Sequence, residues 1–167
     1  MEKLVSSRRI KRRLKSLARE IESDYKKSSS ILPPVLICIL NGSVHFFSDL
    51  SRALKVDAEI DFIRLKSYDG QDNSKGITVT KELEVELKGK MVYIIDDICD
   101  TGETIIEALH MVNSKQPLEV KTVTLFKRKG GKELSDFYGF EIGDEWLVGY
   151  GFDDFGLKRN EKHVYKL

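Results

Sequence analysis

The stretch MVYIIDDICDTGET, residues 91–104, decides the fold and directs the search for function. Its first five residues, Met91 to Ile95, are apolar without a break, which is typical of a strand buried on both faces of a sheet. An acidic loop follows, and a helix is expected from about Glu103 to Asn113. A buried strand that leads through a short loop into a helix is one unit of an α/β fold.

The rest of the chain repeats this alternation. The apolar run Val35 to Leu40 is a second buried strand, and it passes through the turn Asn41-Gly42-Ser43 into a helix from Val44 to Leu54. The other predicted elements are a helix at Ser6–Lys26 and strands at Val56–Phe62, Ile77–Thr80, Val120–Phe126, Glu145–Phe152 and His163–Leu167. Strands that alternate with helices predict an α/β fold with a parallel core sheet flanked by helices. Ligands of such sheets bind at the carboxyl ends of the strands.

Length and composition fit one soluble globular domain. The 167 residues suffice for a single sizeable core, and 41% of them are hydrophobic and 33% charged. Lys and Arg number 28 against 27 Asp and Glu, so the net charge of +1 exerts no global pull toward nucleic acid or membrane.

The sequence favours a cytoplasmic protein. Its longest apolar run, Val35 to Leu40, is far shorter than the roughly 20 residues of a membrane span. The basic N-terminus lacks the apolar region of a secretion signal. Cys38 and Cys99 stand in different contexts without metal-ligand spacing, which indicates two free thiols in a reducing compartment.

The acidic loop carries the chemistry. Asp96, Asp97 and Asp100 follow a buried strand, where carboxylates repel one another and need cations, hydroxyl donors or backbone N–H groups as partners. Immediately afterwards, Gly102 allows close approach of a ligand to the backbone, and the start of the helix favours an anion. A sugar phosphate is the ligand that needs both halves of this loop.

Neither a Walker loop nor simple helix capping accounts for this segment. A Walker loop is excluded because no Gly-Lys-Ser/Thr follows the glycine. Helix capping by Asp100 or Thr101, with Glu103 completing a capping box, would account for one of these residues. It leaves the neighbouring pair Asp96-Asp97 without a role.

The stretch from Val92 to Thr104 resembles the phosphoribosyl-pyrophosphate motif of the type I phosphoribosyltransferases. Further matches point to the hypoxanthine–guanine branch of that family, and they occur in the family's order across residues 5 to 165. These matches are Leu40-Asn-Gly-Ser43, Asp61-Phe-Ile-Arg-Leu-Lys-Ser-Tyr68, Leu125-Phe-Lys-Arg128, Gly139-Phe-Glu-Ile142 and Val148-Gly-Tyr150.

The resemblance implies a type I phosphoribosyltransferase fold in a single domain, residues 1–167. A small hood over the purine would combine the C-terminal segment with part of the N-terminal region. It also implies displacement of pyrophosphate from C1 of the ribose by a purine nitrogen. Catalysis would then rest on positioning, on neutralisation of the leaving group by Mg²⁺ and on one proton transfer.

Roles for the acidic loop follow from the resemblance. Asp96 and Asp97 would hold the ribose hydroxyls and the metal environment, and Asp100 would accept the proton from purine N7 as general base. The metal would be Mg²⁺, with Asp153 near a second ion. The 5-phosphate would be bound by Asp100, Thr101, Gly102, Glu103 and Thr104.

The same resemblance assigns the purine site. Lys127 would donate to O6 and so select 6-oxopurines, although a surface lysine is the commoner case for such a residue. Trp146 would stack on the ring, with a core tryptophan as the ordinary alternative. Leu147 would read the base edge through its backbone, and Asp153 would complete the purine side of the site.

Pyrophosphate would be received by Asn41, Gly42 and Arg159. Many relatives carry Lys or Arg where this chain has the neutral Asn41, so binding there would depend on the backbone N–H groups. The polar run from Ser67 to Gly76 predicts a mobile loop. In the family, the loop that begins at Ser67 and Tyr68 closes over the reacting centre and excludes water.

The partners implied are phosphoribosyl pyrophosphate, a 6-oxopurine and the nucleotide product, within a homodimer or homotetramer. One rival is an RNA-binding regulator on the same fold, like the pyrimidine-operon regulators. The feature that supports this rival is the group of six cations between Arg8 and Lys15. Ile10, Leu14 and Leu17 give the same helix an apolar stripe, which favours a solvated cationic face over nucleic-acid binding.

The other rival is an enzyme of this superfamily that acts on xanthine or uracil.

Overall fold

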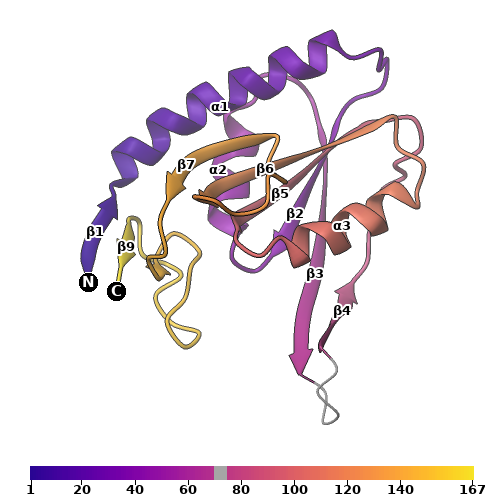
Figure 1. Ribbon diagram of the computed structural model, residues 1–167. Coiled ribbons are helices and arrows are strands. Elements are labelled where there is room, and N and C mark those ends of the chain that lie inside the picture. The colour runs from indigo at the N-terminus through magenta and orange to yellow at the C-terminus, as the bar shows by residue number, and fades with distance from the viewer. Residues whose placement is uncertain (70–74) are drawn as a thin grey trace.

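The computed structural model describes residues 1–69 and 75–167. Within them the chain forms three helices and nine strands (Figure 1). In chain order these are β1 (Glu2–Val5), α1 (Ser7–Lys27), β2 (Val35–Leu40), α2 (Val44–Ala53), β3 (Glu59–Asp69), β4 (Lys75–Lys81), β5 (Met91–Cys99), α3 (Glu103–Asn113), β6 (Glu119–Arg128), β7 (Phe137–Ile142), β8 (Leu147–Val148) and β9 (Val164–Lys166).

The larger sheet has six strands in the order β4-β3-β2-β5-β6-β7. Every neighbouring pair is parallel except β3 with β4, which is antiparallel. β5 lies inside the sheet, where Ile95 pairs with Cys38 of β2 and with Val123 of β6. The carboxyl ends of β2, β5 and β6 therefore meet at one edge, which is where ligands of parallel sheets bind.

Helices cover both faces of this sheet (Figure 1), and the side chains of β2 alternate between them. Leu36 and Cys38 belong to the core cluster that contains the buried residues of α1 and α2. Val35, Ile37 and Ile39 belong to a second cluster, together with buried residues of α3. Burial on both faces explains why β2 and the part of β5 from Met91 to Ile95 are continuously apolar rather than alternating. The predicted α/β architecture is confirmed.

A small sheet of three strands, β1-β9-β8, joins the two ends of the chain. Lys3 of β1 and Val148 of β8 both pair with Tyr165 of β9 in antiparallel register. Figure 1 shows the N- and C-termini side by side beyond one end of α1. The segment between β8 and β9 is thereby fixed to the N-terminal end of the chain.

The structure corrects the predicted strands near the C-terminus. Of the predicted strand Glu145–Phe152, only Leu147–Val148 is a strand, because the chain turns at Gly149, Tyr150 and Gly151, all with positive φ. β1 and β7 were not predicted. The strand β7 could not be predicted because apolar and polar residues alternate only weakly in Phe137–Ile142, and most of its side chains are only partly buried.

The predicted loop from Ser67 to Gly76 is shorter in the structure. Ser67 and Tyr68 lie in β3 and pair with Ile77 and Gly76 of β4. The predicted closure falls largely on residues 70–74, which lie outside the described residues. β3 also starts at Glu59 rather than at Val56.

Candidate active site

A cavity of about 160 Å³ lies where the end of β5 and the end of β6 face the segment that follows β7. Six residues predicted for the site line it, together with Ile98, Arg128 and Phe152. The six are Asp97, Asp100, Trp146, Leu147, Asp153 and Arg159. Residues far apart in sequence are brought together at the edge of the sheet that the strand pattern indicates.

Of the pair Asp96-Asp97, Asp97 lines this cavity and Asp96 is buried next to it in the chain. Asp96 is only 7% exposed, and its Oδ1 accepts a hydrogen bond of 3.0 Å from the backbone N–H of Asp97. Burial, and then the neighbouring charge of Asp97, raise the pKa of Asp96 well above its usual value. Burial raises the pKa of Asp97 to about 6. The pair is short of positive partners, which is the property expected of a cation site.

Arg159 is a cation that acts on this pair. Its charge opposes the rise in the pKa of Asp97, although burial has the larger effect. Its guanidinium also binds Asp153, at 2.6 Å from Nη2 to Oδ1, and donates from Nη1 to the carbonyl of Gly151 at 2.6 Å. The cavity therefore has an acidic wall and a basic wall, as a ligand with a sugar and phosphates requires.

The start of α3 offers backbone donors rather than a capped end. Its N-cap is Gly102, with φ of 82°, and no side chain caps the helix. Thr101 Oγ1 accepts only a long bond of 3.4 Å from the N–H of Glu103. The carboxylate of Asp100 is turned to Arg128 instead. The alternative of a capped helix is therefore wrong, and the N–H groups of this loop point to an anion site.

The turn after β2 approaches the same aspartates. The peptide bond Leu40–Asn41 is cis, and Asn41 is exposed. A β-carbon on Gly42 would overlap the carboxylate of Asp97, and one on Gly151 would overlap the carbonyl of Gly42. Asn41 and Gly42 do not line the cavity themselves, but Gly42 lies against Asp97, which does.

Trp146 and Leu147 come from the start of β8. Trp146 is 64% exposed although it is the chain's only tryptophan, so the alternative of a core residue is wrong. Leu147 is buried and lines the cavity beside it. An exposed indole at the mouth of a cavity is free to stack on a flat ring.

Lys127 does not line the cavity. Its Nζ lies 3.2 Å from Glu133 Oε2 and 3.6 Å from Glu141 Oε2, and it stands 4.3 Å from the ring centroid of Tyr138. The next residue, Arg128, lines the cavity instead. Successive side chains of a strand point to opposite faces, which is why Lys127 and Arg128 lie on different sides of β6. The assignment of Lys127 to the purine stays a prediction.

Residues 1–154 match the family described as the phosphoribosyl transferase domain. The chain belongs to the phosphoribosyltransferase family.

Relatives agree over nearly the whole chain. The hypoxanthine-guanine phosphoribosyltransferase of Aquifex aeolicus is 37% identical over 97% of this chain and 92% of its own length. The hypoxanthine phosphoribosyltransferase of Escherichia coli is 34% identical over 92% of this chain and 87% of its own length. The type I phosphoribosyltransferase fold is shown by these matches together with the solved structures.

Two of those solved structures illustrate the agreement. A hypoxanthine-guanine phosphoribosyltransferase of Bacillus anthracis, with HEPES in its active site, has a TM-score of 0.91 and 30% identity, and the match covers 100% of this chain and 98% of that one. The hypoxanthine phosphoribosyltransferase of Trypanosoma cruzi in complex with the product IMP has a TM-score of 0.91 and 30% identity, with 100% and 94% covered.

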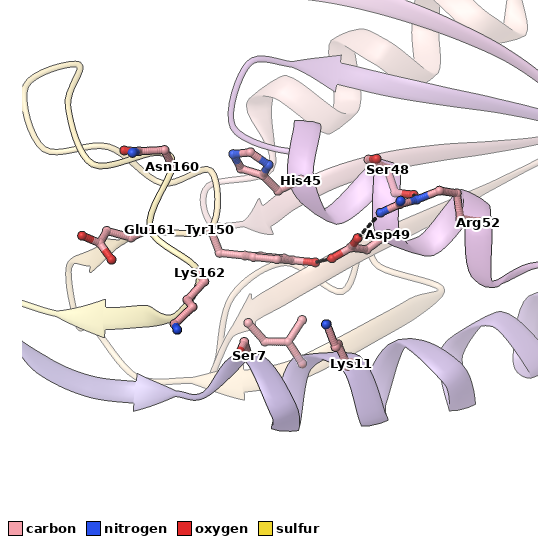
Figure 2. A pocket seen from close by; sticks show the side chains of 11 residues that line it. Ser7, Lys11, His45, Ser48, Asp49, Arg52, Tyr150, Asn160, Glu161 and Lys162 are labelled. Carbon is pink, nitrogen blue, oxygen red and sulfur yellow. Dashed lines mark hydrogen bonds and ion pairs between the residues drawn. The ribbon is translucent and has the colours of Figure 1, made fainter.

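This phosphoribosyltransferase has a second, larger cavity of about 310 Å³ between α1, α2 and the segment before β9. Figure 2 shows Tyr150 lying across it, with its hydroxyl on Asp49 of α2 and with Arg52 on the same carboxylate. The two bonds measure 2.7 and 2.6 Å. None of the residues predicted for the site lines this cavity. Its volume is therefore no guide to where the reaction occurs.

Two of the basic residues at the start of α1 make contacts within the fold. Arg13 binds Glu20 at 2.6 Å and the carbonyls of Tyr138 and Gly139 of β7, and Arg9 lies 5.3 Å from the ring centroid of Phe140. These contacts attach α1 to the edge strand of the large sheet. They give these two arginines a structural role that needs no nucleic acid.

The carboxylates of the candidate site suit a Mg²⁺ ion whose other ligands would come from the substrate. Among residues 1–69 and 75–167, no three His, Cys, Asp or Glu side chains gather as a complete metal cluster. Mg²⁺ needs only one or two carboxylates beside phosphate oxygens and waters. The buried pair Asp96-Asp97, with its raised pKa values, and Asp153 across the cavity fit that requirement.

Over the described part of the chain, none of the helices combines the length and the apolar character needed to cross a membrane.

Proposed function

We propose that this phosphoribosyltransferase transfers the 5-phosphoribosyl group of phosphoribosyl pyrophosphate to hypoxanthine, and also to guanine. The products are IMP or GMP and pyrophosphate, so the role is purine salvage. One observation carries the proposal: Asp97 of the buried acidic pair, Asp100 just before the start of α3, and the exposed Trp146 line a single cavity. The relatives named for hypoxanthine and guanine, at 34–37% identity, support the choice of base.

The reaction needs one bond made, one broken and one proton moved. N9 of the base forms a bond to C1 of the ribose, and the bond from C1 to pyrophosphate breaks with its electron pair leaving on pyrophosphate. The proton on N7 passes to the carboxylate of Asp100, which faces the cavity. Trp146 stacks on the base, and Leu147 contributes its backbone to the base edge.

The 5-phosphate is bound by the loop at the start of α3. Its oxygens accept hydrogen bonds from the free N–H groups of the first turn and from the hydroxyls of Thr101 and Thr104. Gly102 has a positive φ, and a β-carbon there would overlap the side chain of Leu134, so the conformation of this loop requires glycine. The segment thus comprises Asp100, Thr101, Gly102, Glu103 and Thr104.

Asp96 or Asp97, together with the ribose hydroxyls, would hold Mg²⁺, and Asp153 would serve a second ion. When bound, the metal neutralises the charge that develops on the pyrophosphate leaving group. Arg159 and the turn Asn41-Gly42 receive the pyrophosphate. The proximity of Gly42 to Asp97 supports this grouping.

The small sheet and the segment between β8 and β9 serve as the hood over the base, so that residues 1–167 form one domain. Ser67 and Tyr68, at the end of β3, begin the segment that closes over the reacting centre. A homodimer or homotetramer is included in the proposal, supported by the exposed apolar side chains of Phe155 and Leu157. The free thiols of Cys38 and Cys99 support a cytoplasmic location.

The proposal is tested by turnover with phosphoribosyl pyrophosphate, Mg²⁺ and each of hypoxanthine, guanine, xanthine, adenine and uracil. We expect nucleotide product from hypoxanthine and guanine, little from adenine, and none after Mg²⁺ is chelated. Product from uracil or xanthine alone would contradict the choice of base. Absence of product from every base, together with sequence-specific RNA binding, would favour the regulator instead.

A further inference from the structure

His163 joins the two ends of the chain through its side chain. It lies just before β9, and its Nδ1 accepts a hydrogen bond of 2.9 Å from the backbone N–H of Ser7, the first residue of α1. The first N–H groups of a helix have no partners inside the helix, so a side chain that accepts from one of them caps it. Ser6 accepts from the N–H of Arg9 in the same turn. The start of α1 is therefore capped by a neighbour and by a residue 156 positions further along the chain.

The backbone of His163 contacts the segment that follows β8. Its carbonyl oxygen occupies the space that a β-carbon on Gly149 would need. Beside this contact, the N–H of Tyr150 donates to the carbonyl of Glu161 at 2.8 Å. The segment after β8 and the segment before β9 are thus packed together, and the side chain of His163 attaches both to the start of α1.

One wall of the candidate cavity belongs to this part of the chain. Five of the residues that line the cavity lie between β7 and β9, namely Trp146, Leu147, Phe152, Asp153 and Arg159. We call these five residues the C-terminal wall. The pairing of β8 with β9 and of β9 with β1 attaches this wall to the N-terminal strand. The bond from Ser7 to His163 attaches it to α1.

This bond requires a neutral imidazole. Nδ1 can accept only when it carries no proton, so the ring proton of His163 must be on Nε2. Partial burial, and then the charges of Lys3 and Lys162, lower the pKa of His163 below its usual value, while Glu161 acts in the opposite direction. The positive end of the α1 dipole also opposes a charged ring. Tyr165 of β9 presents its ring edge-on, with the centroids 6.0 Å apart.

We propose that His163 is a positioning residue that fixes the C-terminal wall to α1 when its ring is neutral and releases the wall when its ring is protonated. Folding lowers the pKa of His163 below 6.5, so the unfolded state binds its proton more tightly than the folded one. The stabilisation is therefore fully present above 6.5 and is lost as the pH falls through the lower folded value. This inference rests on the proposed function, which assigns the wall to the base and the pyrophosphate.

The position of the ring proton can be measured in the free protein by multiple-bond ¹H–¹⁵N NMR correlation. The chain has three histidines, and the signal that disappears in His163→Asn identifies His163. At pH 7.5 we expect a proton on Nε2 and none on Nδ1. A proton on Nδ1 at this pH would overturn the inference. The measurement needs no substrate, so its result holds whether or not the protein catalyses transfer.

The variants His163→Asn and His163→Leu separate the hydrogen bond from the ring. Asn offers its Oδ1 as an acceptor at any pH, whereas Leu offers none. At pH 7.5 we expect His163→Leu to raise KM for hypoxanthine and for phosphoribosyl pyrophosphate by about 3- to 10-fold, the usual worth of one hydrogen bond, with a smaller change in kcat. His163→Asn should recover most of that loss. A lower Tm in His163→Leu with both KM values unchanged would overturn the inference.

The pH profile distinguishes positioning from a purely structural role. Other groups of the site, Asp97 among them, titrate alike in wild type and in His163→Asn, so the ratio of the two KM values reports on His163. We expect this ratio to be close to one at pH 7.5. It should rise to about 3- to 10-fold over the pH range in which NMR shows His163 taking up its proton. Parallel profiles for the two proteins would overturn the inference.

His110→Asn is the matched control, because His110 is exposed on α3. Its KM values should follow those of wild type at each pH. Absence of transfer to every base would contradict the proposed function, and the free energy of unfolding would then replace KM as the readout. Wild type should lose stability relative to His163→Asn as the pH falls below 6.5. Equal losses in the two proteins would overturn the inference.

Discussion

The carboxylate of Asp97 packs against the α-carbon of Gly42. It occupies the space that the β-carbon of any other residue at position 42 would need. Gly42 follows β2 and Asp97 is near the end of β5, so the contact joins the ends of two neighbouring strands. Gly151 packs against the carbonyl of Gly42. The turn, the acidic pair and the segment after β8 are therefore packed without room for a side chain.

Gly42→Ala should inactivate the enzyme while leaving it folded. The added methyl group would force the Asp97 carboxylate to turn away, and the positions of the metal and the ribose would move with it. We expect kcat/KM to fall by about 100-fold, because small misplacements of reacting groups have effects of this size. Steady-state kinetics with hypoxanthine measures the loss.

Gly89→Ala is the control for that substitution. A β-carbon at Gly89 meets no atom within 4 Å, and its φ of +72° makes alanine strained there. This variant should lose about 1 kcal/mol of stability and keep its activity. If Gly42→Ala retained full activity, the close contact with Asp97 would have no part in the reaction.

The acidic pair should make the free protein less stable as the pH rises toward neutrality. Folding raises the pKa of Asp97 from 3.8 to about 6, so the folded state binds a proton more tightly than the unfolded one. The resulting stabilisation is present below the unfolded value and is lost as the pH rises through about 6. Asp97→Asn should therefore raise Tm at pH 7.5 and have less effect at pH 5. Thermal unfolding at the two pH values measures this difference.

The exposed Asp144→Asn serves as the control, with the same change of charge outside the cavity. Mg²⁺ together with phosphoribosyl pyrophosphate should stabilise wild type more at pH 7.5 than at pH 5, because the metal replaces the proton as partner of the pair. A Tm of Asp97→Asn that fell equally at both pH values would show that the pair is a structural hydrogen-bonding unit.

The parts of the site that the sequence predicts best are those attached to long, regular elements. β2 and the first five residues of β5 are continuously apolar and each strand leads into a helix, so the strand–helix order around the acidic residues follows from the sequence. The predicted end of the strand at Ile95 was wrong: β5 continues to Cys99, so Asp96 and Asp97 lie within the strand rather than in a loop. The hydrogen-bonding partners of the loop do not follow from it. Asp100 pairs with Arg128 rather than capping α3, a contact between residues 28 positions apart in the chain.

The C-terminal third was harder to predict, for two physical reasons. Gly149 and Gly151 break the predicted strand through positive φ values, and two-residue β8 gives no periodic signal. At the end of β6, side chains alternate between the two faces of the sheet, so the contacts that Lys127 and Arg128 make depend on a register that only the sheet reveals. β1 pairs with β9 across nearly the whole chain, and no local pattern marks such a contact.

Trp146 should affect substrate binding far more than stability. It is 64% exposed, so its replacement removes little buried area, whereas stacking on a base contributes about 1–3 kcal/mol. We expect Trp146→Leu to raise KM for hypoxanthine about 5- to 100-fold, with Tm within about 2 °C of wild type. Trp146→Phe should bind nearly as well as wild type. A large drop in Tm with unchanged KM would show that Trp146 supports the fold instead.

Tyr150→Phe should loosen the C-terminal segment from α2. Tyr150 is 7% exposed, and its hydroxyl donates to Asp49 Oδ2 at 2.7 Å (Figure 2). Burial and this bond to a carboxylate raise the pKa of Tyr150, so the hydroxyl keeps its proton and remains a donor. Removing a hydrogen bond to a charged group costs about 1.5–3 kcal/mol. Chemical denaturation should show a loss of this size.

The loss of the Tyr150 hydroxyl should also affect the candidate active site, because Tyr150 is followed in the chain by a residue that contacts the site. Tyr150 precedes Gly151, whose carbonyl binds Arg159 and whose α-carbon packs on Gly42. We therefore expect Tyr150→Phe to raise KM for phosphoribosyl pyrophosphate several-fold more than KM for hypoxanthine. Tyr165→Phe is the control, since its hydroxyl has no protein partner in the described chain. Equal changes in the two KM values would mean that Tyr150 acts on stability alone and does not position the pyrophosphate side of the cavity.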